Sequence, residues 1–170
     1  MAVSTWTSGP GVPFAETGWD EIASGLWMGG HQRKGTGGGL VPVLVGSEFD
    51  VVISLYQQAG HGPAPEVEHH VALMPDGPLT TRQIDRVREL AGIAATAIHG
   101  GRRVLVRCYA GYNRSGLVAG QTLIQLGHTP KDAIDRIRAR RSPWALHNRL
   151  FVDYLTSGLD LARLLTDLRD

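Results

Sequence analysis

Short apolar runs alternate with stretches of helical period along this chain. Two runs, Val51-Val-Ile-Ser-Leu55 and Val104-Leu-Val106, are continuous and rich in β-branched side chains, which is typical of strands buried on both faces. A third run, residues 67–74, predicts another strand. Residues 22–28 predict a short strand pair that turns at Ser24-Gly25.

Four segments predict helices. The first begins at Thr80 or Thr81, either of which can cap it, and ends at Gly100-Gly101. Its apolar side chains recur at helical spacing on one face: Ile84, Val87, Ala91, Ala94 and Ile98. The other predicted helices are residues 115–126, a helix that begins at Thr129-Pro130, and residues 147–168. Strands that alternate with helices indicate the α/β class, with a central, mainly parallel sheet flanked by helices.

The domain organisation follows from chain length and from the placement of glycine and proline. A chain of 170 residues suits one domain. Residues 1–18 are rich in Gly, Pro, Ser and Thr without a period, and they predict a partly ordered leader. Residues 19–170 would then form a single domain. Residues 29–39 hold six glycines, which predicts a flexible loop.

Composition and charge narrow the class of protein. Hydrophobic residues make up 42% and charged residues 19% of the chain, which indicates a folded globular protein. The formal net charge of +1 gives no reason to expect nucleic acid or an acidic membrane as a partner. We find no signal-peptide pattern and no apolar run of ~18 residues, so we expect a cytoplasmic protein without a membrane span.

The single cysteine, Cys108, lies where the buried run that begins at Val104 ends. One cysteine excludes a disulfide within the chain and argues against a cysteine metal cluster. A lone cysteine is most often a small buried apolar residue. Here, however, five residues separate Cys108 from Arg114, and a predicted helix follows.

A strand, a tight loop and a helix in this order can bind an anion. Backbone N–H groups of such a loop converge on the anion, and the positive end of the helix dipole faces it. The same field favours the thiolate, which is the nucleophilic form of cysteine. The planar guanidinium of Arg114 matches two phosphate oxygens, and the Ser115 hydroxyl can donate to the thiolate when it leaves. We call residues 108–115 the phosphate loop, with five expected substrate-binding residues: Tyr109, Ala110, Gly111, Tyr112 and Asn113.

The phosphate loop resembles the signature of the protein-tyrosine-phosphatase superfamily, in particular that of the dual-specificity phosphatases, His-Cys-x-x-Gly-x-x-Arg-Ser. The resemblance covers most of residues 19–155, with weaker matches at Gly25-Leu-Trp-Met-Gly29 and at residues 141–151. It implies a phosphatase-like fold, a phosphocysteine intermediate on Cys108 and no metal or other cofactor. It also implies that Arg141 braces the loop.

One position departs from the signature, because Arg107 stands where the family has His. Arginine keeps a positive charge beside the thiol but cannot reproduce the hydrogen-bond geometry of histidine. We therefore expect an active loop with altered pH behaviour, and Arg107 leaves open a second hypothesis. This is a pseudophosphatase, a module that binds phosphorylated partners without turnover.

Cleavage of a phosphate ester also needs an acid that protonates the leaving oxygen. From residue type alone, Asp76 in Pro75-Asp76-Gly77-Pro78 fits a turn residue as well as an acid. The resemblance favours the acid, because the family carries an aspartate on the loop before the helix that precedes the nucleophile's strand. Asp50 matches this place poorly.

Several other polar residues admit two interpretations. His61, His69 and His70 invite a metal site, but neighbours in a strand point to opposite faces, which argues against one. Three residues of the glycine-rich segment either border the entrance or form a solvated basic turn: His31, Arg33 and Lys34. A basic run predicts mostly solvated surface: Arg136, Arg138, Arg140 and Arg141. Trp144 and Tyr112 are candidates for the pocket rim, with the core as the alternative for Trp144.

The resemblance implies a protein phosphatase that hydrolyses phosphotyrosine. The chain lacks the recognition motif of the large tyrosine-specific enzymes, so a shallower pocket would also admit phosphoserine and phosphothreonine. The variable loop positions carry no lysine, which argues against phosphoinositide substrates. The expected partners are phosphorylated proteins or peptides, and phosphate or sulfate in the loop.

Overall fold

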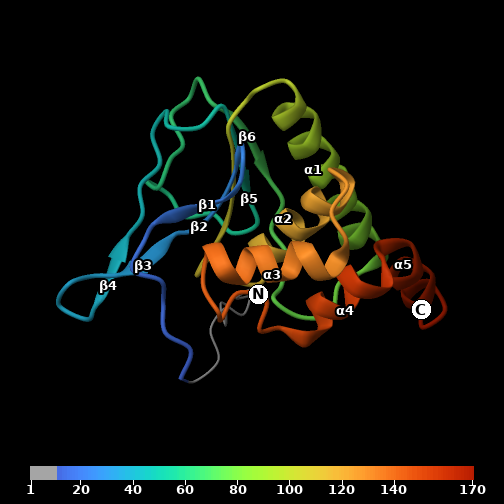
Figure 1. Cartoon of the computed structure of the whole chain (residues 1–170). Helices are drawn as coiled ribbons and strands as arrows, with labels where there is room; N and C mark the ends of the chain where they lie inside the picture. The colour runs from blue at the N-terminus through green and yellow to red at the C-terminus, as the bar shows by residue number, and fades with distance from the viewer. Residues whose placement is uncertain (1–10) are drawn as a thin grey trace.

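A computed structural model of the chain describes residues 11–170, and in them a five-stranded sheet forms the centre of the fold (Figure 1). Its strands follow the order β1-β2-β7-β5-β6: β1 (Trp19–Ala23), β2 (Leu26–Gly30), β7 (Val104–Cys108), β5 (Val51–Ser54) and β6 (Glu68–Val71). β1 pairs antiparallel with β2, and every other pairing in this sheet is parallel. The predicted α/β class with a mainly parallel sheet is confirmed.

Helices gather on one side of this sheet, which is the right-hand side in Figure 1. They are α1 (Thr81–His99), α2 (Arg114–Gln125), α3 (Pro130–Arg140), α4 (Arg149–Ser157) and α5 (Leu159–Asp167). Side-chain caps fix the start of three of these helices. Thr80, Thr129 and Asn148 each accept a hydrogen bond from a backbone N–H of the first turn. Thr80 forms a full capping box with Gln83, and Pro130 occupies the first turn of α3.

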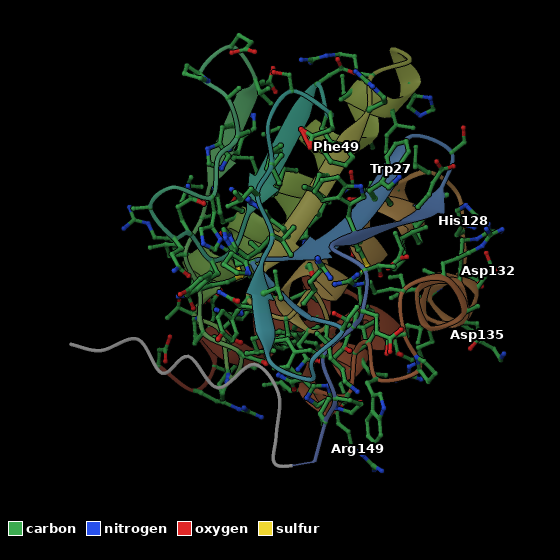
Figure 2. The ribbon with its side chains drawn as sticks, turned by 90° about the vertical axis from the view of Figure 1, so that its left-hand side faces the viewer. Trp27, Phe49, His128, Asp132, Asp135 and Arg149 are labelled. Atoms are coloured by element: carbon green, nitrogen blue, oxygen red, sulfur yellow. The ribbon has the colours of Figure 1, made fainter. Side chains whose placement is uncertain are left out.

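The two faces of the sheet bury different cores. The larger core lies between the sheet and the helices and includes Met28, Val106, Leu117 and Phe151. The opposite face of the sheet carries a smaller apolar cluster. In this cluster the Phe49 ring lies 5.5 Å from the Trp27 ring (Figure 2). The sheet is therefore covered on both faces, as expected for strands without apolar–polar alternation.

Two predictions about the elements are wrong. The single helix predicted over residues 147–168 is two helices, because Gly158 has φ of 97° and breaks the chain direction between α4 and α5. The segment 29–39 is no simple flexible loop: β2 extends to Gly30, and a two-stranded sheet follows. Its strands are β3 (Gln32–Lys34) and β4 (Leu40–Pro42), and glycines form the turn between them.

The described part of the predicted leader packs onto the domain. The Tyr112 hydroxyl donates to the Pro13 carbonyl at 2.6 Å, and the Lys34 backbone N–H donates to the Ala15 carbonyl at 2.8 Å. Residues 1–10 of that leader lie outside the described residues. Within residues 11–170, no helix has the length and apolar character needed to cross a membrane.

Candidate active site

The phosphate loop runs from the end of β7 at Cys108 to the start of α2 at Arg114. Gly111 has φ of 77°, and a Cβ built there would lie 2.6 Å from the backbone of Gly29. Only glycine fits this turn, because it tolerates the left-handed backbone and the close approach of β2. The His31 N–H donates to the carbonyls of Cys108 and Tyr109 at 3.0 and 2.8 Å, which fixes the start of the loop.

The nucleophile candidate Cys108 lies beside Ser115. The Cys108 Sγ and the Ser115 Oγ are 3.2 Å apart, and both residues are buried. Ser115 is the second residue of α2, so the sulfur faces the N-terminal turn of a helix, where backbone N–H groups favour an anion. The hydroxyl can donate a hydrogen bond to the sulfur, as the sequence interpretation requires.

Arg114 carries the donors that suit a phosphate. Its side chain is buried, and Nη1 donates to the Met74 carbonyl at 3.2 Å. Its Nε and Nη2 are buried and have no hydrogen-bond partner among the described residues. These two nitrogens form one edge of the guanidinium, which is the geometry that binds two oxygens of one phosphate. A buried donor without a partner costs about 1–3 kcal/mol, so the arrangement favours an incoming acceptor.

Two side-chain amides donate to Asp76, one from the phosphate loop and one from the residue that caps α4. Its Oδ2 accepts from Asn113 Nδ2 at 2.9 Å, and its Oδ1 accepts from Asn148 Nδ2 at 2.6 Å. Asn113 Oδ1 in turn accepts from the Asn148 backbone N–H at 3.0 Å. The structure therefore brings Asp76 next to the residue that precedes Arg114. The contact from Asn148 was not predicted, although Asn148 lies in the segment that resembles the family's closing motif.

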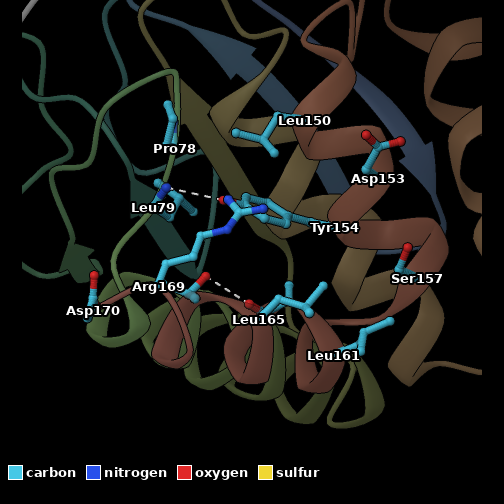
Figure 3. Close-up of a pocket in the computed structure, with 12 residues that line it drawn as sticks. Pro78, Leu79, Leu150, Asp153, Tyr154, Ser157, Leu161, Leu165, Arg169 and Asp170 are labelled. Carbon is cyan, nitrogen blue, oxygen red and sulfur yellow. Dashed lines mark hydrogen bonds between the residues drawn. The ribbon is translucent and has the colours of Figure 1, made fainter.

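The segment that carries Asp76 is also tied to α4. The Leu79 backbone N–H donates to the Tyr154 hydroxyl at 3.2 Å, which Figure 3 shows at the edge of a pocket of about 440 Å³. This pocket lies between α4, α5 and residues 78–79, and Leu161 and Leu165 contribute to its lining. Among the described residues that line it, none is a predicted catalytic residue, so this pocket is separate from the candidate site.

Arg141 contacts the loop from the side of β1. Its Nε donates to the Gly111 carbonyl at 3.1 Å and its Nη2 to the Ala110 carbonyl at 3.2 Å. Its Nη1 forms a 2.8 Å ion pair with Asp20. The Arg141 side chain is fully buried in that pair. These contacts fit the bracing role that the resemblance implied for Arg141 within a basic run predicted to be mostly solvated.

Arg107 points away from the phosphate loop, into the segment that follows β5. Its side chain is fully buried and donates to the Ser54 hydroxyl, the Gln57 side chain and the carbonyls of His61 and Gly62, at 2.6 to 3.0 Å. Burial lowers the pKa of Arg107 to about 10, so it stays charged near neutral pH. Arg107, the residue that departs from the family signature, is thus part of a buried hydrogen-bond network.

The histidines have separate partners. His31 is buried, with its Nδ1 3.1 Å from the Nδ1 of His61, and burial together with the charge of Arg107 lowers the pKa of His31 to about 3. His69 contacts the Ser54 hydroxyl at 2.8 Å, and His70 pairs with Glu68 at 2.9 Å. The prediction that His31 lies in a solvated basic turn is wrong, because its side chain is buried. In the residues with described positions, no group of three or more acidic, His or Cys side chains is arranged to hold a metal ion.

The remaining candidates divide between surface and core. Tyr112 is buried, so its side chain does not form a pocket rim, whereas Trp144 is 44% exposed. Arg138 is partly buried and donates to the carbonyls of Ala145 and Leu146, so it helps to hold the chain before α4. Arg140 is exposed, as predicted.

Sequence reasoning missed Tyr56. Its ring centroid lies 5.8 Å from the Arg114 Cζ, within the range of a cation–π contact. The available signal was its position, two residues after a buried strand whose carboxyl end lies at the sheet edge where ligands bind in such folds.

Known proteins are similar to this chain in sequence and in fold. The sequence model of the family described as "Cyclin-dependent kinase inhibitor 3 (CDKN3)" matches residues 44–134, which is more than half of the chain. The chain belongs to this family. Cyclin-dependent kinase inhibitor 3 of Rattus norvegicus is 35% identical over 106 residues, and that of Homo sapiens is 32% identical over the same length. Each match covers 61% of this chain and 46% of the relative, so the chain spans about half the length of these curated relatives.

Solved structures of dual-specificity phosphatases share the fold. Human DUSP28 superposes with a TM-score of 0.66 at 16% identity, covering 88% of this chain and 99% of that chain. A mouse putative dual specificity phosphatase complexed with zinc tungstate gives a TM-score of 0.64 at 19% identity, with 91% and 94% covered. The CDKN3-family chain therefore has the fold of the protein-tyrosine-phosphatase superfamily and resembles its dual-specificity members, as the phosphate loop predicted.

Proposed function

We propose that this chain is a cysteine-dependent protein phosphatase that hydrolyses phosphotyrosine, and also phosphoserine and phosphothreonine in proteins or peptides. The observation that carries the proposal is Arg114, whose buried Nε and Nη2 have no partner among the described residues. They lie at the start of the helix that also holds Ser115 against the Cys108 sulfur. A phosphate dianion would satisfy these donors.

The first step is the attack of the Cys108 thiolate on phosphorus. The P–O bond to the substrate breaks as the S–P bond forms, and Asp76 in its acid form gives its proton to the leaving oxygen. For this step, Asp76 must release at least one of its amide hydrogen bonds from Asn113 and Asn148, because a protonated oxygen accepts less well. The helix end and Arg114 stabilise the charge on the transferred phosphoryl group.

The second step returns the enzyme to its starting state. Asp76, now a carboxylate, takes a proton from water while that water attacks phosphorus and the S–P bond breaks. Inorganic phosphate leaves, and the Ser115 hydroxyl stabilises the departing Cys108 thiolate at the 3.2 Å separation. Both oxygens of Asp76 accept hydrogen bonds in the structure, which is the arrangement that suits this carboxylate step.

Turnover of p-nitrophenyl phosphate by the purified chain tests the proposal. We expect Cys108→Ser to abolish turnover while it retains binding of inorganic phosphate, because the loop amides and Arg114 remain. Asp76→Ala should slow turnover by about 10²-fold and leave phosphate binding largely intact. Phosphate binding without turnover in the unaltered chain would instead support the pseudophosphatase hypothesis, which Arg107 leaves open.

A further inference from the structure

His147 lies in the turn between α3 and α4, directly before Asn148, and this turn is held against the phosphate loop. The Leu146 backbone N–H donates to the Tyr112 carbonyl at 3.1 Å, and the Leu146 carbonyl accepts from Arg138 at 3.0 Å. Leu146 has φ of 58°, a left-handed conformation that residues other than glycine rarely adopt. Such a strained backbone persists only where neighbouring contacts hold it, and here it brings the His147 side chain to the loop.

The contacts of the His147 ring determine where its hydrogen lies. Nδ1 is 2.9 Å from the Trp144 carbonyl, which can only accept, so we assign the hydrogen of the neutral ring to Nδ1. Nε2 then has a free lone pair, and it lies 3.2 Å from Asn113 Nδ2. An edge-to-face contact with the Tyr112 ring, at 6.3 Å and 81°, helps to hold the plane of the imidazole. His147 is therefore placed to accept a hydrogen bond from Asn113.

Asn113 needs this acceptor, because it is buried and its side-chain amide carries two hydrogens. One hydrogen of Nδ2 bonds to Asp76 Oδ2 at 2.9 Å, and the other bonds to His147 Nε2. The Asn113 Oδ1 accepts from the Asn148 backbone N–H at 3.0 Å. Turning the amide over would place its oxygen against the Asp76 carboxylate and its NH2 group against the Asn148 N–H. His147 and Asn148 thus fix the orientation in which Asn113 donates to Asp76.

We propose that His147 is a positioning residue for Asp76 and acts through Asn113. This inference rests on the proposed function, in which the Asp76 carboxylate takes a proton from water in the second step. The O–P bond from that water forms, the S–P bond breaks, and its electron pair leaves on the Cys108 sulfur. An amide of fixed orientation holds the carboxylate where this transfer needs it, whereas an amide free to turn over would at times present its oxygen and repel the carboxylate.

A double-mutant cycle on the turnover of p-nitrophenyl phosphate tests this inference. His147→Leu removes the acceptor, while the Trp144 carbonyl keeps the backbone N–H of residue 147 as a donor at 3.2 Å. We expect kcat to fall about 2- to 10-fold, the effect of one hydrogen bond. His147→Gln should recover most of this loss, because its side-chain oxygen can accept from Asn113. In the Asp76→Ala background, His147→Leu should change kcat less than about 1.5-fold, since the carboxylate that it positions is gone.

The cycle distinguishes positioning from a general structural role. An equal fall in kcat with and without the Asp76 side chain would overturn the inference, and so would a fall in His147→Gln as large as in His147→Leu. Inhibition by inorganic phosphate is measured on the same variants. We expect its inhibition constant to stay within about twofold of that of the unaltered chain, because Arg114 and the loop amides are unchanged. A larger loss would contradict a role through Asp76, since it would indicate a damaged loop.

Hydrogen exchange of the Asn113 side-chain amide, followed by NMR, separates a failure of this inference from a failure of the proposed function, because it needs no turnover. Both hydrogens of Nδ2 are bonded, so we expect both to exchange slowly with solvent in the unaltered chain and in His147→Gln. One of them should exchange faster in His147→Leu. The two signals are identified by their absence in Asn113→Asp. Unchanged exchange in His147→Leu would overturn the inference. Protection that depends on His147 in a chain without turnover would support the positioning of Asp76 and refute the proposed enzyme.

Discussion

Arg107 immediately precedes the phosphate loop and Arg114 lies near its end, and both side chains are buried. Arg107 donates to a hydroxyl, a side-chain amide and two carbonyls, all supplied by residues 54–62. Arg114 donates to one carbonyl, that of Met74, and two further nitrogens have no partner in residues 11–170. The same residue type is thus satisfied internally at one end of the loop and left with free donors at the other.

This difference in hydrogen bonding distinguishes Arg107, which stabilises the fold, from Arg114, whose donors are available to a ligand. Burial of a guanidinium is costly, and the chain offsets this cost at Arg107 with four neutral acceptors. At Arg114 the cost stays largely uncompensated, which is common at sites where stability is given up for binding. Substitutions at the two positions should therefore produce opposite patterns of stability and activity.

The largest expected effect is on activity, at Arg114. Arg114→Lys keeps the positive charge but loses the edge formed by Nε and Nη2, so we expect kcat/KM for p-nitrophenyl phosphate to fall about 10²–10³-fold. The free energy of unfolding should stay within about 1 kcal/mol of the unaltered chain, because few internal hydrogen bonds are lost. Steady-state kinetics and urea unfolding measure the two quantities. A large loss of stability with intact kinetics would show that the two arginines have been assigned the wrong way round.

The second effect is on stability, at Arg107. Arg107→Met replaces the guanidinium with an apolar side chain and removes its hydrogen bonds to Ser54, Gln57 and two carbonyls. The carbonyls of His61 and Gly62 each keep one other donor, the Val45 backbone N–H and the Gln57 side chain. We expect a loss of about 3 kcal/mol in the free energy of unfolding, measured by urea denaturation. Turnover per folded molecule should fall less than in Arg114→Lys, because Arg107 points away from the loop. Equal falls in turnover for the two variants would contradict a purely structural role for Arg107.

The contrast between the two arginines also shows how far the sequence alone could lead. The spacing from Cys108 to Arg114 was enough to predict the loop, because strand, loop and helix are local features and the spacing is specific. The partners of Arg107 could not be predicted, since they lie about 50 residues earlier and reach it only when β5 pairs with β7. Asp76 was predicted through the resemblance, whereas its amide partners Asn113 and Asn148 depend on how α4 packs.

The same limit explains the errors in the elements. Gly158 interrupts an otherwise continuous helical pattern, and sequence alone does not distinguish a glycine tolerated within a helix from one with φ of 97°. The glycines of residues 35–39 form a tight turn only because β3 and β4 pair on either side of them. His31 appeared solvated among polar neighbours, yet it follows β2 directly and is buried beneath the loop.

The third prediction concerns the pH dependence of stability, and it tests how strongly the Arg107 charge lowers the pKa of His31. Burial first and the Arg107 charge second lower the pKa of His31 to about 3, against 6.5 in the unfolded chain. Below pH 6.5 the unfolded chain therefore binds a proton that the folded chain does not, and the free energy of unfolding falls as the pH falls towards 3. The contribution of His31 to this fall in the free energy of unfolding is at most about 1.4 kcal/mol per pH unit.

Urea unfolding between pH 7 and pH 4.5 measures this slope. We expect His31→Gln to flatten it, because glutamine does not titrate. Arg107→Met should flatten it in part, since removal of the cation raises the His31 pKa while burial still lowers it. A slope that is identical in the unaltered chain and in His31→Gln would show that other groups control the acid sensitivity.

The smallest expected effect sharpens the comparison at a single side chain. Gln57→Leu removes the Oε1 acceptor that lies 3.0 Å from Arg107 Nη2 and the Nε2 donor that lies 3.2 Å from the Gly62 carbonyl, but Arg107 Nη2 keeps its 2.6 Å bond to that carbonyl. We therefore expect a loss of only about 1 kcal/mol in the free energy of unfolding by urea. The matched control, Gln57→Glu, retains an acceptor and should cost less than Gln57→Leu. A loss of about 3 kcal/mol in Gln57→Leu, as large as that expected for Arg107→Met, would mean that the network depends on this one side chain rather than on four shared acceptors.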